Sequence, residues 1–296
     1  MAMPHAQMLS WLFPLAITST LAVAALVYLR GWTSLRSAFP TLIGGWRLAA
    51  FMSGLVFVWT ALASPLAALD HHSLTIHMMK HLLLMTAAAP LILAGAPVFT
   101  LMCGLPKLFI KTYPPLASLP ARWLERCLRA PVLCWLAGTM AVIGWHLPGA
   151  FQLGMRSHGI HLLEDLSFLV AGLSFWWPIV QSPPSAARSP RWSMAVYLFL
   201  ATLPCDIVSA SLVFCNRVVY PFYMSAPHLF SLLPLEDQEC AGALMWVWVT
   251  FAYLTPAVAI TVQMLSPSKM QSQRSVQPVA HEVTGWSRNG AEPEAL

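Results

Sequence analysis

Long apolar runs separated by short polar connections make up most of the chain. Seven of these runs contain about 20 residues each, the length that an α-helix needs to cross the hydrocarbon core of a membrane. The pattern therefore predicts an all-α, polytopic membrane protein, a bundle of seven transmembrane helices. The predicted spans are residues 11–29, 47–69, 76–101, 131–147, 159–180, 192–214 and 239–265.

Proline and glycine interrupt the third of these spans. Pro90, Gly95 and Pro97 predict that it kinks or ends in a broken turn before Cys103, because proline removes a helical hydrogen bond. Residues 104–130 are basic and contain prolines, so we expect them to lie along the inner membrane surface.

The pattern divides the chain into three parts. We expect an outer N-terminal segment at residues 1–10, a seven-helix transmembrane domain at residues 11–265, and an inner tail at residues 266–296. The tail is polar and contains Pro and Ser, a composition typical of disorder.

The composition also indicates a membrane protein. Apolar residues make up 58% of the chain and charged residues 9%, whereas soluble globular proteins have a charged fraction of about 25%. This difference excludes an ordinary soluble globule. Residues 1–10 carry no Lys or Arg, and Arg30 follows the first apolar run, so we expect no removable signal peptide.

The distribution of Lys and Arg predicts the orientation of the bundle. With the N-terminus outside and the C-terminus inside, thirteen of the 16 basic residues fall on the inner side, as the positive-inside rule requires. The outer side then holds Lys80, Arg156 and Arg217. The net charge of +5 thus indicates an inner surface that faces anionic membrane lipid, and not a nucleic-acid site.

The histidines show the opposite distribution. Of the ten, only His281 maps to the inner tail. The other nine map to the outer side or to outer helix ends: His5, His71, His72, His77, His81, His146, His158, His161 and His228.

His77 and His81 begin the third span and are four residues apart. On a helix they share one face, about 6 Å apart along the axis, and Met85 continues that face. Two imidazoles and a thioether in line suit a soft metal such as Cu(I). For the pair alone, the alternative is that both histidines are amphipathic residues at the membrane boundary.

Further polar residues lie near the outer ends of other spans. His146 ends the fourth span, and His161 shares the first turns of the fifth span with Glu164 and Asp165. Asp206 lies inside the sixth span, where a carboxylate is either functional or paired with a structural partner.

The six cysteines show no CxxC motif and no zinc-finger spacing. Cys215 and Cys240 lie near the outer ends of spans six and seven. They could form a disulfide, supply a thiolate to a metal, or pack inertly, and we favour inert packing.

Several motifs in order along the chain resemble the CtaG family of cytochrome c oxidase assembly factors. The resemblance covers residues 45–265, and the ordered combination is more specific than any single motif. The motifs are Ala61-Leu62-Ala63-Ser64-Pro65-Leu66, the stretch His77 to Met85, Pro90, Gly95-Ala96-Pro97, Trp145-His146-Leu147-Pro148, His161-Leu162-Leu163-Glu164, Phe175-Trp176-Trp177-Pro178, Asp237-Gln238, Ala241-Gly242 and Met245-Trp246. At Asp165 the family pattern has a second His, so a site built on that position would be O-ligated or partnered differently here.

The resemblance implies a multi-pass protein of the bacterial inner (plasma) membrane that is required to make an active heme-copper oxidase. A role in delivering copper to that oxidase is inferred for the family. The family is distinct from the single-span copper chaperones, which share this task. The expected partners are cytochrome c oxidase subunits and membrane lipid. The protein could itself form a homodimer.

Together, motif and resemblance predict an assembly factor that is not an enzyme and that holds Cu(I) at the outer ends of spans three, four and five. His77 and His81 form the core pair, His146 and His161 complete the site, and Met78 and Met85 soften it. Three carboxylates are expected to accept hydrogen bonds from imidazoles and to fix their tautomers: Glu164, Asp165 and Asp237. We expect this site to be exposed, because transfer to a partner needs ligand exchange.

Three other functions compete with copper delivery. A scaffold that holds an oxidase subunit could carry the same histidines for contact. A heme-binding redox protein could use them as axial ligands, although these histidines lie close to the membrane boundary. Transport through the broken third span is a further alternative, but the sequence contains no inverted repeat.

Overall fold

The computed structural model describes residues 5–38, 44–106, 119–181, 191–225 and 232–265, and every regular element in these ranges is helical. The expected disordered tail at 266–296 and residues 1–4 of the expected N-terminal segment lie outside the described residues. Helix α1 begins at His5, within that segment.

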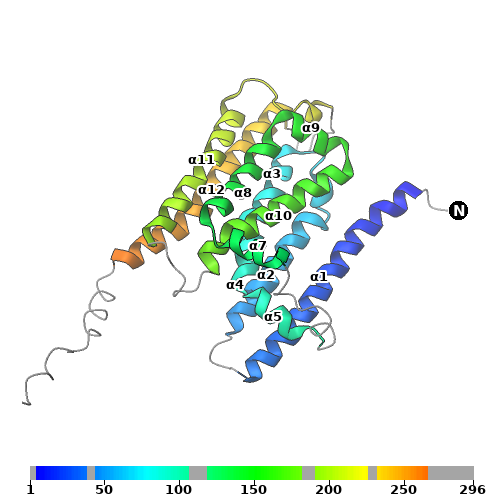
Figure 1. Ribbon diagram of the computed structural model, residues 1–296. Coiled ribbons are helices and arrows are strands. Elements are labelled where there is room, and N and C mark those ends of the chain that lie inside the picture. Colours follow the sequence, from blue (N-terminus) through cyan, green and yellow to red (C-terminus); the bar gives the residue numbers. More distant parts are fainter. Residues whose placement is uncertain (1–4, 39–43, 107–118, 182–190, 226–231, 266–296) are drawn as a thin grey trace, which may run out of the picture.

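The helices follow one another along the chain with few long connections (Figure 1). The first half contains α1 (His5–Ala38), α2 (Gly45–Leu62), the short 3-10 helix η1 (Ala67–Leu69), α3 (Leu74–Leu82), the π-helix η2 (Leu83–Ala88), α4 (Ala89–Ala94) and α5 (Pro97–Gly104). The second half contains α7 (Leu119–Leu128), α8 (Pro131–His146), α9 (Pro148–Arg156), α10 (His158–Val180), α11 (Arg191–Phe214), the short η3 (Pro221–Met224) and α12 (Pro234–Leu265).

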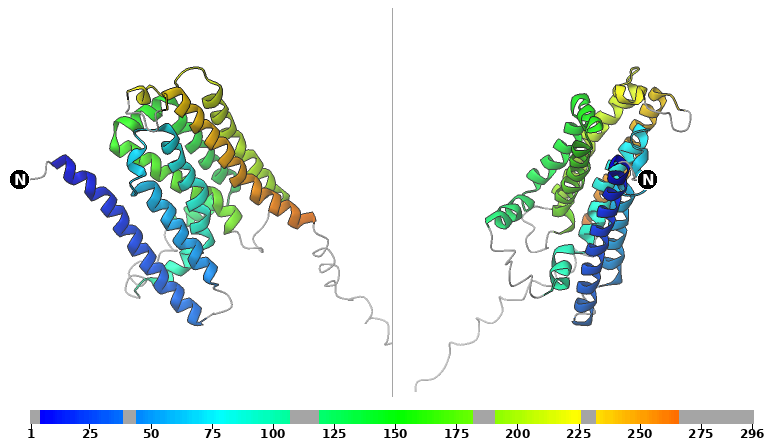
Figure 2. Two further views of the ribbon diagram at one scale, coloured as in Figure 1. Left: turned by 180° about the vertical axis from the view of Figure 1, so that it is seen from behind. Right: turned by 90° about the vertical axis from the view of Figure 1, so that its right-hand side faces the viewer.

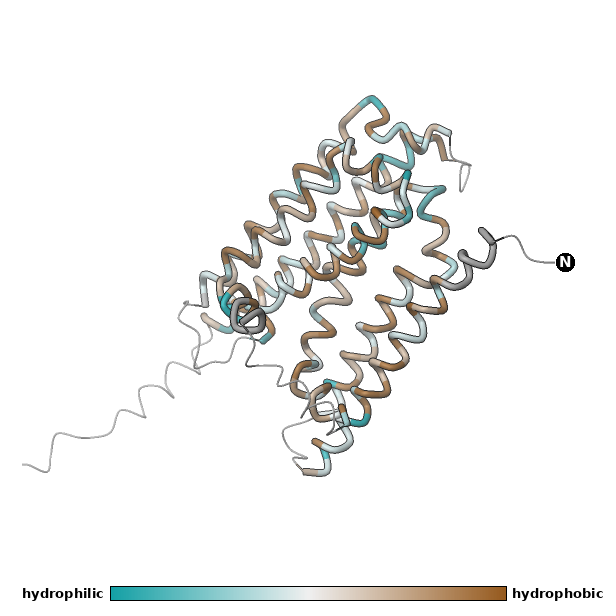
Figure 3. The backbone as a smooth tube through the Cα atoms, turned by 45° about the vertical axis from the view of Figure 1, so that its right-hand side comes forward, coloured by the Kyte–Doolittle hydropathy of each residue, from teal (hydrophilic) through white to brown (hydrophobic). Residues whose placement is uncertain are grey.

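Six helical segments of the described chain are long and apolar enough to cross a membrane, or seven if α8 and α9 count as one bent span. These two helices meet at an angle of 76°. Large apolar side chains such as Ile207 and Phe251 are 71% and 69% exposed on the outside of the bundle, where lipid would cover them. Hydrophobic colour prevails along the long helices in Figure 3, and hydrophilic colour gathers near their ends. The protein is therefore a multi-pass membrane protein.

The third predicted span is broken, as the prolines and glycine indicated. Regular helix stops at Ala94, Ala96 takes the left-handed conformation with φ 49°, and α5 starts at Pro97. The span proper covers Leu74–Ala94, so the predicted end at residue 101 was too late.

This span is the centre of the bundle. In its most apolar stretch 72% of the residues are buried, against 44% or less in the other five single-helix spans. It packs against α2, α10 and α12, and α1 lies at the opposite side of the molecule from α11 (Figures 1 and 2). Polar side chains on this span are therefore surrounded by protein and not by lipid.

A π-helical turn interrupts the central span at η2. Its wider turn leaves the Met85 carbonyl available, and the Trp176 indole donates a hydrogen bond to it at 3.0 Å. Helix α10 approaches closely here because Gly172 has no side chain; a Cβ at this position would lie 2.8 Å from the Met85 Cα.

The start of the central span is fixed by Asp237 of α12. Its carboxylate accepts hydrogen bonds from the Ser73 hydroxyl at 2.8 Å and from the Leu74 backbone N–H at 2.6 Å. It also accepts one from the Thr75 hydroxyl at 2.7 Å. Asp237 thus satisfies free donors at the N-terminus of α3, where a negative charge also suits the helix dipole. It was expected to orient an imidazole, but its side-chain hydrogen bonds in the described chain go to residues 73–75.

Asp237→Ala should therefore lower the thermal stability of the detergent-solubilised protein. Removing the acceptor leaves buried donors at the start of α3 unsatisfied, at a cost of about 1–3 kcal/mol. The exposed Glu239 on the same helix provides the control, and Glu239→Ala should leave the melting temperature unchanged. Equal melting temperatures for both variants would contradict the capping role.

Candidate metal centre

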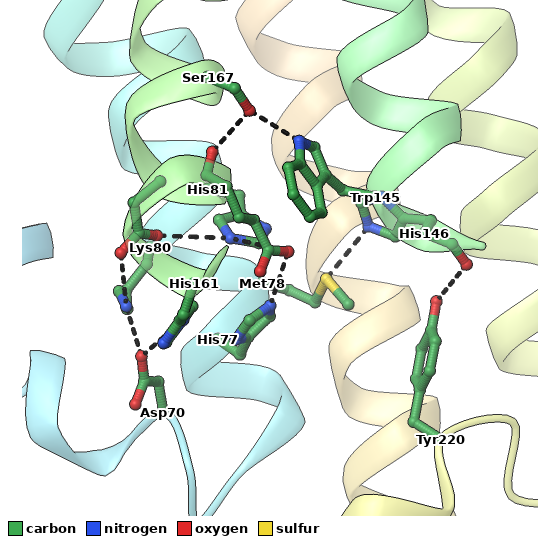
Figure 4. A network of polar contacts seen from close by, with 12 residues as sticks. Asp70, His77, Met78, Lys80, His81, Trp145, His146, His161, Ser167 and Tyr220 are labelled. Carbon is green, nitrogen blue, oxygen red and sulfur yellow. Dashed lines mark hydrogen bonds and ion pairs between the residues drawn. The ribbon is translucent and has the colours of Figure 1, made fainter. Parts of the chain in front are cut away.

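Two imidazoles and one carboxylate meet inside the bundle at the end where α3 begins, which we call the histidine end. His77 and His81 lie on one face of α3 with ring centroids 4.4 Å apart, and Glu164 reaches them from α10. The Glu164 Oε1 lies 3.4 Å from the His77 Nε2 and 3.6 Å from the His81 Nε2 (Figure 4). We call these three residues the central cluster.

The polar atoms of the central cluster lack hydrogen bonds. All three side chains are buried, with His77 0% and Glu164 1% exposed. Both ring nitrogens of each histidine and both Glu164 oxygens have no hydrogen-bond partner among the described residues. A buried polar group without a partner is costly, so such a concentration in one place needs a physical reason.

The distances within the central cluster fit a shared metal ion. Two ligand atoms bound at roughly 2.0–2.2 Å around a tetrahedral ion lie about 3.3–3.6 Å apart. The two nitrogen–oxygen separations of 3.4 and 3.6 Å match this value and are too long for good hydrogen bonds. A cation placed between the three groups would satisfy atoms that the protein leaves free, so the residues present fit a metal.

A second group with ligand geometry lies beside the first, at the mouth of the site. The mouth group consists of Asp70, His71 and His161, whose ligand atoms lie within 4.8 Å of one another. The His161 Nε2 is 3.3 Å from the Asp70 Oδ2, and its ring stacks on His77 with centroids 5.4 Å apart. His161 therefore connects the mouth group to the central cluster.

A buried lysine separates the carboxylates at the mouth. The Lys80 ammonium pairs with Asp70 and, at 3.2 Å, with the Asp165 Oδ2 (Figure 4). Burial alone would raise the pKa of the Asp70 carboxyl, but the charge and hydrogen bond of Lys80, together with His161 and His77, outweigh burial and hold this pKa below its ordinary value. Asp70 therefore stays charged, and Lys80 already neutralises part of the mouth group.

A large cavity leads to the mouth group. Its volume is about 580 Å³, and it lies between Phe13 and Pro14 of α1, the η1 region and the starts of α3 and α10. Apolar residues such as Phe13 and Leu62 form one part of its lining. Its polar lining includes Asp70, His71, Lys80, His158, His161 and Asp165. An ion arriving through this cavity would meet the mouth group before the central cluster.

Aromatic residues cover the central cluster on the other side. The bend between α8 and α9 brings Phe151 to 5.0 Å from the His77 ring, and Phe151 stacks on Tyr220 at 4.0 Å. Tyr220 donates a hydrogen bond to the His146 carbonyl at 2.9 Å, and Tyr223 donates one to the Asp70 carbonyl at 2.8 Å. Burial raises the pKa of both phenols, and nearby carboxylate charge raises it further, so both remain donors.

The structure separates the predicted ligands into groups. His77, His81 and Glu164 come together, and His161 lies beside them. Glu164 was expected only to orient an imidazole, but its Oε1 lies 3.4 and 3.6 Å from the His77 and His81 Nε2 atoms, spacings that suit a ligand of the same ion. His146, Met78 and Met85 line a smaller cavity that also touches His81. Asp165 approaches the His81 Nε2 at 3.6 Å while it pairs with Lys80, so it keeps its expected supporting position.

The expectation of an exposed site was wrong, because α9, α10 and η3 bury the histidines. Sequence reasoning also missed Asp70 and Lys80 as members of the site. A signal was available, since Lys80 lies within an apolar run and a charge at such a position is by default paired or functional.

The other polar and sulfur-bearing candidates are not part of this site. Asp206 is half-buried on α11, and of its two alternatives, a functional role or a structural partner, no hydrogen-bonded or ion-paired partner is seen among the described residues. Cys215 and Cys240 are both free thiols, so the disulfide alternative is not realised.

Comparison with known proteins identifies a family. A family model described as cytochrome c oxidase caa3 assembly factor (Caa3_CtaG) matches residues 26–266. An uncharacterized protein of Mycobacterium leprae is 24% identical over 267 residues, which is 86% of this chain and 39% of that protein. Uncharacterized proteins of Mycobacterium bovis and Mycobacterium tuberculosis are each 25% identical over 262 residues, with the same two shares. The chain thus spans about two fifths of the length of these relatives, and no solved structure matches it significantly.

Lys80→Met should strongly destabilise the protein, because it leaves Asp70 and Asp165 buried without their cation. Removing one partner of a buried ion pair costs about 3–5 kcal/mol. Adding Asp70→Asn to this variant should restore part of the melting temperature in detergent, since one unpaired charge is removed. The exposed Arg156 provides the control through Arg156→Met. A Lys80→Met protein as stable as the control would show that the ion pairs do not hold the mouth together.

Proposed function

The chain belongs to the cytochrome c oxidase caa3 assembly factor family, and from this premise we propose that it binds copper as cargo and delivers it to a copper centre of the oxidase. The cargo is Cu(I), bound first at the histidine end. The protein acts as a metallochaperone in the biogenesis of the respiratory chain and catalyses no reaction. The oxidase subunit that receives the ion is its partner.

One observation carries this proposal: the central cluster holds six buried polar atoms without hydrogen bonds in the described chain, and its two Nε2 atoms lie at distances from the Glu164 Oε1 that suit one shared ion. Imidazole nitrogen is a good ligand for copper, and the Glu164 carboxylate neutralises the charge of the ion. A protein that only needed stability would fill this position with packed apolar side chains. The unsatisfied atoms are consistent with an ion that arrives and leaves.

Each neighbouring residue has a place in this proposal. His161 hands the ion from the mouth group to the central cluster, because its ring stacks on His77 and its Nε2 faces Asp70. Asp165 supports His81 from 3.6 Å. His146, Met78 and Met85 provide softer donors next to His81, on its far side from the mouth.

The proposed delivery takes place on the outer side of a bacterial inner membrane, with the N-terminus outside and the C-terminus inside. The positive-inside distribution of Lys and Arg supports this orientation. The cavity of about 580 Å³ at the mouth then opens on the side where copper for the oxidase would arrive. Loss of the ion to the partner requires ligand exchange, which the three-residue central cluster permits because it does not saturate a copper ion.

The rival functions have less support from the geometry. A scaffold would place histidines on its surface for contact, whereas His77 and His81 are buried. A porphyrin does not fit between these two rings, whose centroids are 4.4 Å apart. Transport would need a path to the other end of the bundle, but aromatic side chains fill the bundle beyond the histidines.

Purified wild-type protein in detergent should bind Cu(I) under reducing conditions, and His77→Ala with His81→Ala should remove the ion bound by the central cluster. The double variant removes both imidazoles of the central cluster, so the remaining carboxylate cannot hold a soft ion. Copper content by mass spectrometry and Cu(I) affinity by competition with a chromophoric chelator provide the measurements.

The same double variant should fail to support oxidase activity in cells. If wild-type protein binds no copper although oxidase assembly still depends on it, direct delivery is wrong and the scaffold function takes its place. A Soret band in the purified protein would instead favour the heme-binding alternative.

A methyl group added at Gly154 should weaken metal binding without unfolding the protein. Gly154 of α9 lies against Glu164, and a Cβ there would be 2.7 Å from the Oε2, so Gly154→Ala pushes the carboxylate away from the histidines. Gly149 on the same helix has no atom within 4 Å of its Cβ position, which makes Gly149→Ala the matched control. We expect at least a tenfold lower copper affinity for Gly154→Ala and none of this loss for Gly149→Ala. Equal affinities would remove Glu164 from the ligand set.

A further inference from the structure

A second cavity lies deeper in the bundle, on the far side of His81 from the mouth. Its volume is about 20 Å³, room for one water-sized guest. It is closed in by α3, η2, α8, α10, α11 and α12. Four sulfur-bearing side chains and two imidazoles line it: Met78, Met85, Cys205, Met245, His81 and His146. The remaining lining is apolar or aromatic apart from Thr86, so we call it the sulfur cavity.

The hydrogen bonds of His146 leave a Lewis base facing this cavity. Its Nδ1 lies 2.7 Å from the Val142 carbonyl oxygen, and since a carbonyl only accepts, the Nδ1 carries the proton. The Nε2 of a neutral ring then has a free lone pair. It points at the Met78 Sδ from 3.2 Å, and a thioether has no proton to share (Figure 4).

Two electron donors in contact without a proton between them repel, unless an electron acceptor lies nearby. Metal bonds of roughly 2.0–2.3 Å to nitrogen and sulfur allow both atoms to bind one ion at a separation of 3.2 Å. Met85, Cys205 and Met245 line the same small space, so the candidate donors beyond His146 and His81 are all sulfur.

Thioethers, a thiol and neutral imidazoles are soft ligands that prefer a monovalent soft ion over a hard or borderline divalent one. From the lining and the His146–Met78 contact we infer that the sulfur cavity is a second metal site, selective for Cu(I), and that His81 passes the ion between it and the central cluster. This inference rests on the proposed function for the origin of the ion. It adds a separate position, two further ligands in Cys205 and Met245, and a source of selectivity that the central cluster lacks.

The far side of the sulfur cavity is closed. Tyr253 forms part of its wall and packs against Phe175 and Trp176 with ring centroids 5.2 and 5.7 Å away, while Tyr197 packs on Phe175 at 4.8 Å. Tyr197 donates its hydroxyl to the Phe175 carbonyl at 2.8 Å, so this aromatic layer is also hydrogen-bonded. The proposed path of the ion therefore runs past His81, and the cavity serves as a holding position and not as part of a channel.

The test is the stoichiometry of Cu(I) binding to the full-length protein, with Ag(I) as an air-stable probe and Zn(II) as the divalent probe. Met78→Leu with Met245→Leu removes two thioethers and nearly conserves volume, a change that protein cores tolerate well. Met140→Leu is the matched control, because Met140 is 59% exposed on the outside of α8. Melting temperatures confirm that each variant is folded.

We expect wild type and Met140→Leu to bind two Cu(I) or Ag(I) ions, and the double Met variant to bind one. Zn(II) binding should be the same in all three proteins, because the central cluster is intact. X-ray absorption at the copper edge should show sulfur scattering in wild type that is lost in the double Met variant. Cys205→Ala should lower the affinity for the ion in the sulfur cavity at least tenfold.

Full Cu(I) stoichiometry with unchanged sulfur scattering in the double Met variant would overturn the inference. That result would leave the proposed function intact if His77→Ala still removed an ion. Conversely, loss of an ion in the double Met variant but no effect of His77→Ala would support the sulfur cavity and contradict the central cluster.

Discussion

The structure depends on one constraint: ligand-type atoms are held inside an apolar bundle without hydrogen bonds of their own. In lipid and in a packed interior, water cannot satisfy His77, His81 and Glu164, so their free atoms are costly unless a cation occupies the space between them. The surrounding elements keep this arrangement from relaxing. Asp237 fixes where α3 starts, and the bend into α9 places Gly154 against the Glu164 carboxylate.

The groups at the histidine end form a sequence of increasing softness. The mouth group presents oxygen and nitrogen beside the Lys80 charge, the central cluster presents two imidazoles with one carboxylate, and the sulfur cavity presents mostly sulfur. His161 and His81 each touch two of these groups. Such a gradient suits a cargo ion that is captured from water and then held against exchange with harder ions, which is the use that we propose for it.

Much of the architecture could be predicted from hydrophobic runs, because span length and proline position follow directly from the thickness of the membrane and the geometry of the helix. The pairing of His77 with His81 was equally accessible, since it is local to one helix. The position of Glu164 as a ligand, the role of Asp237 and the burial of the site depend on contacts between residues far apart in the chain, which spacing does not encode. The bend between α8 and α9 was missed because the fourth span was predicted to end at residue 147. Helix α9 lies beyond that end and was not predicted as a helix.

The most direct measurement is copper transfer between purified proteins. The chain, loaded with isotopically labelled Cu(I) in lipid nanodiscs, is mixed with copper-free oxidase subunit and a chelator that traps free ions, and the label in each protein is then counted. We predict that the label moves to the subunit faster than the chelator captures it, and that a Gly154→Ala chain carries and transfers less label than the wild-type chain. If the label stays with the chain or goes to the chelator first, the protein does not deliver copper.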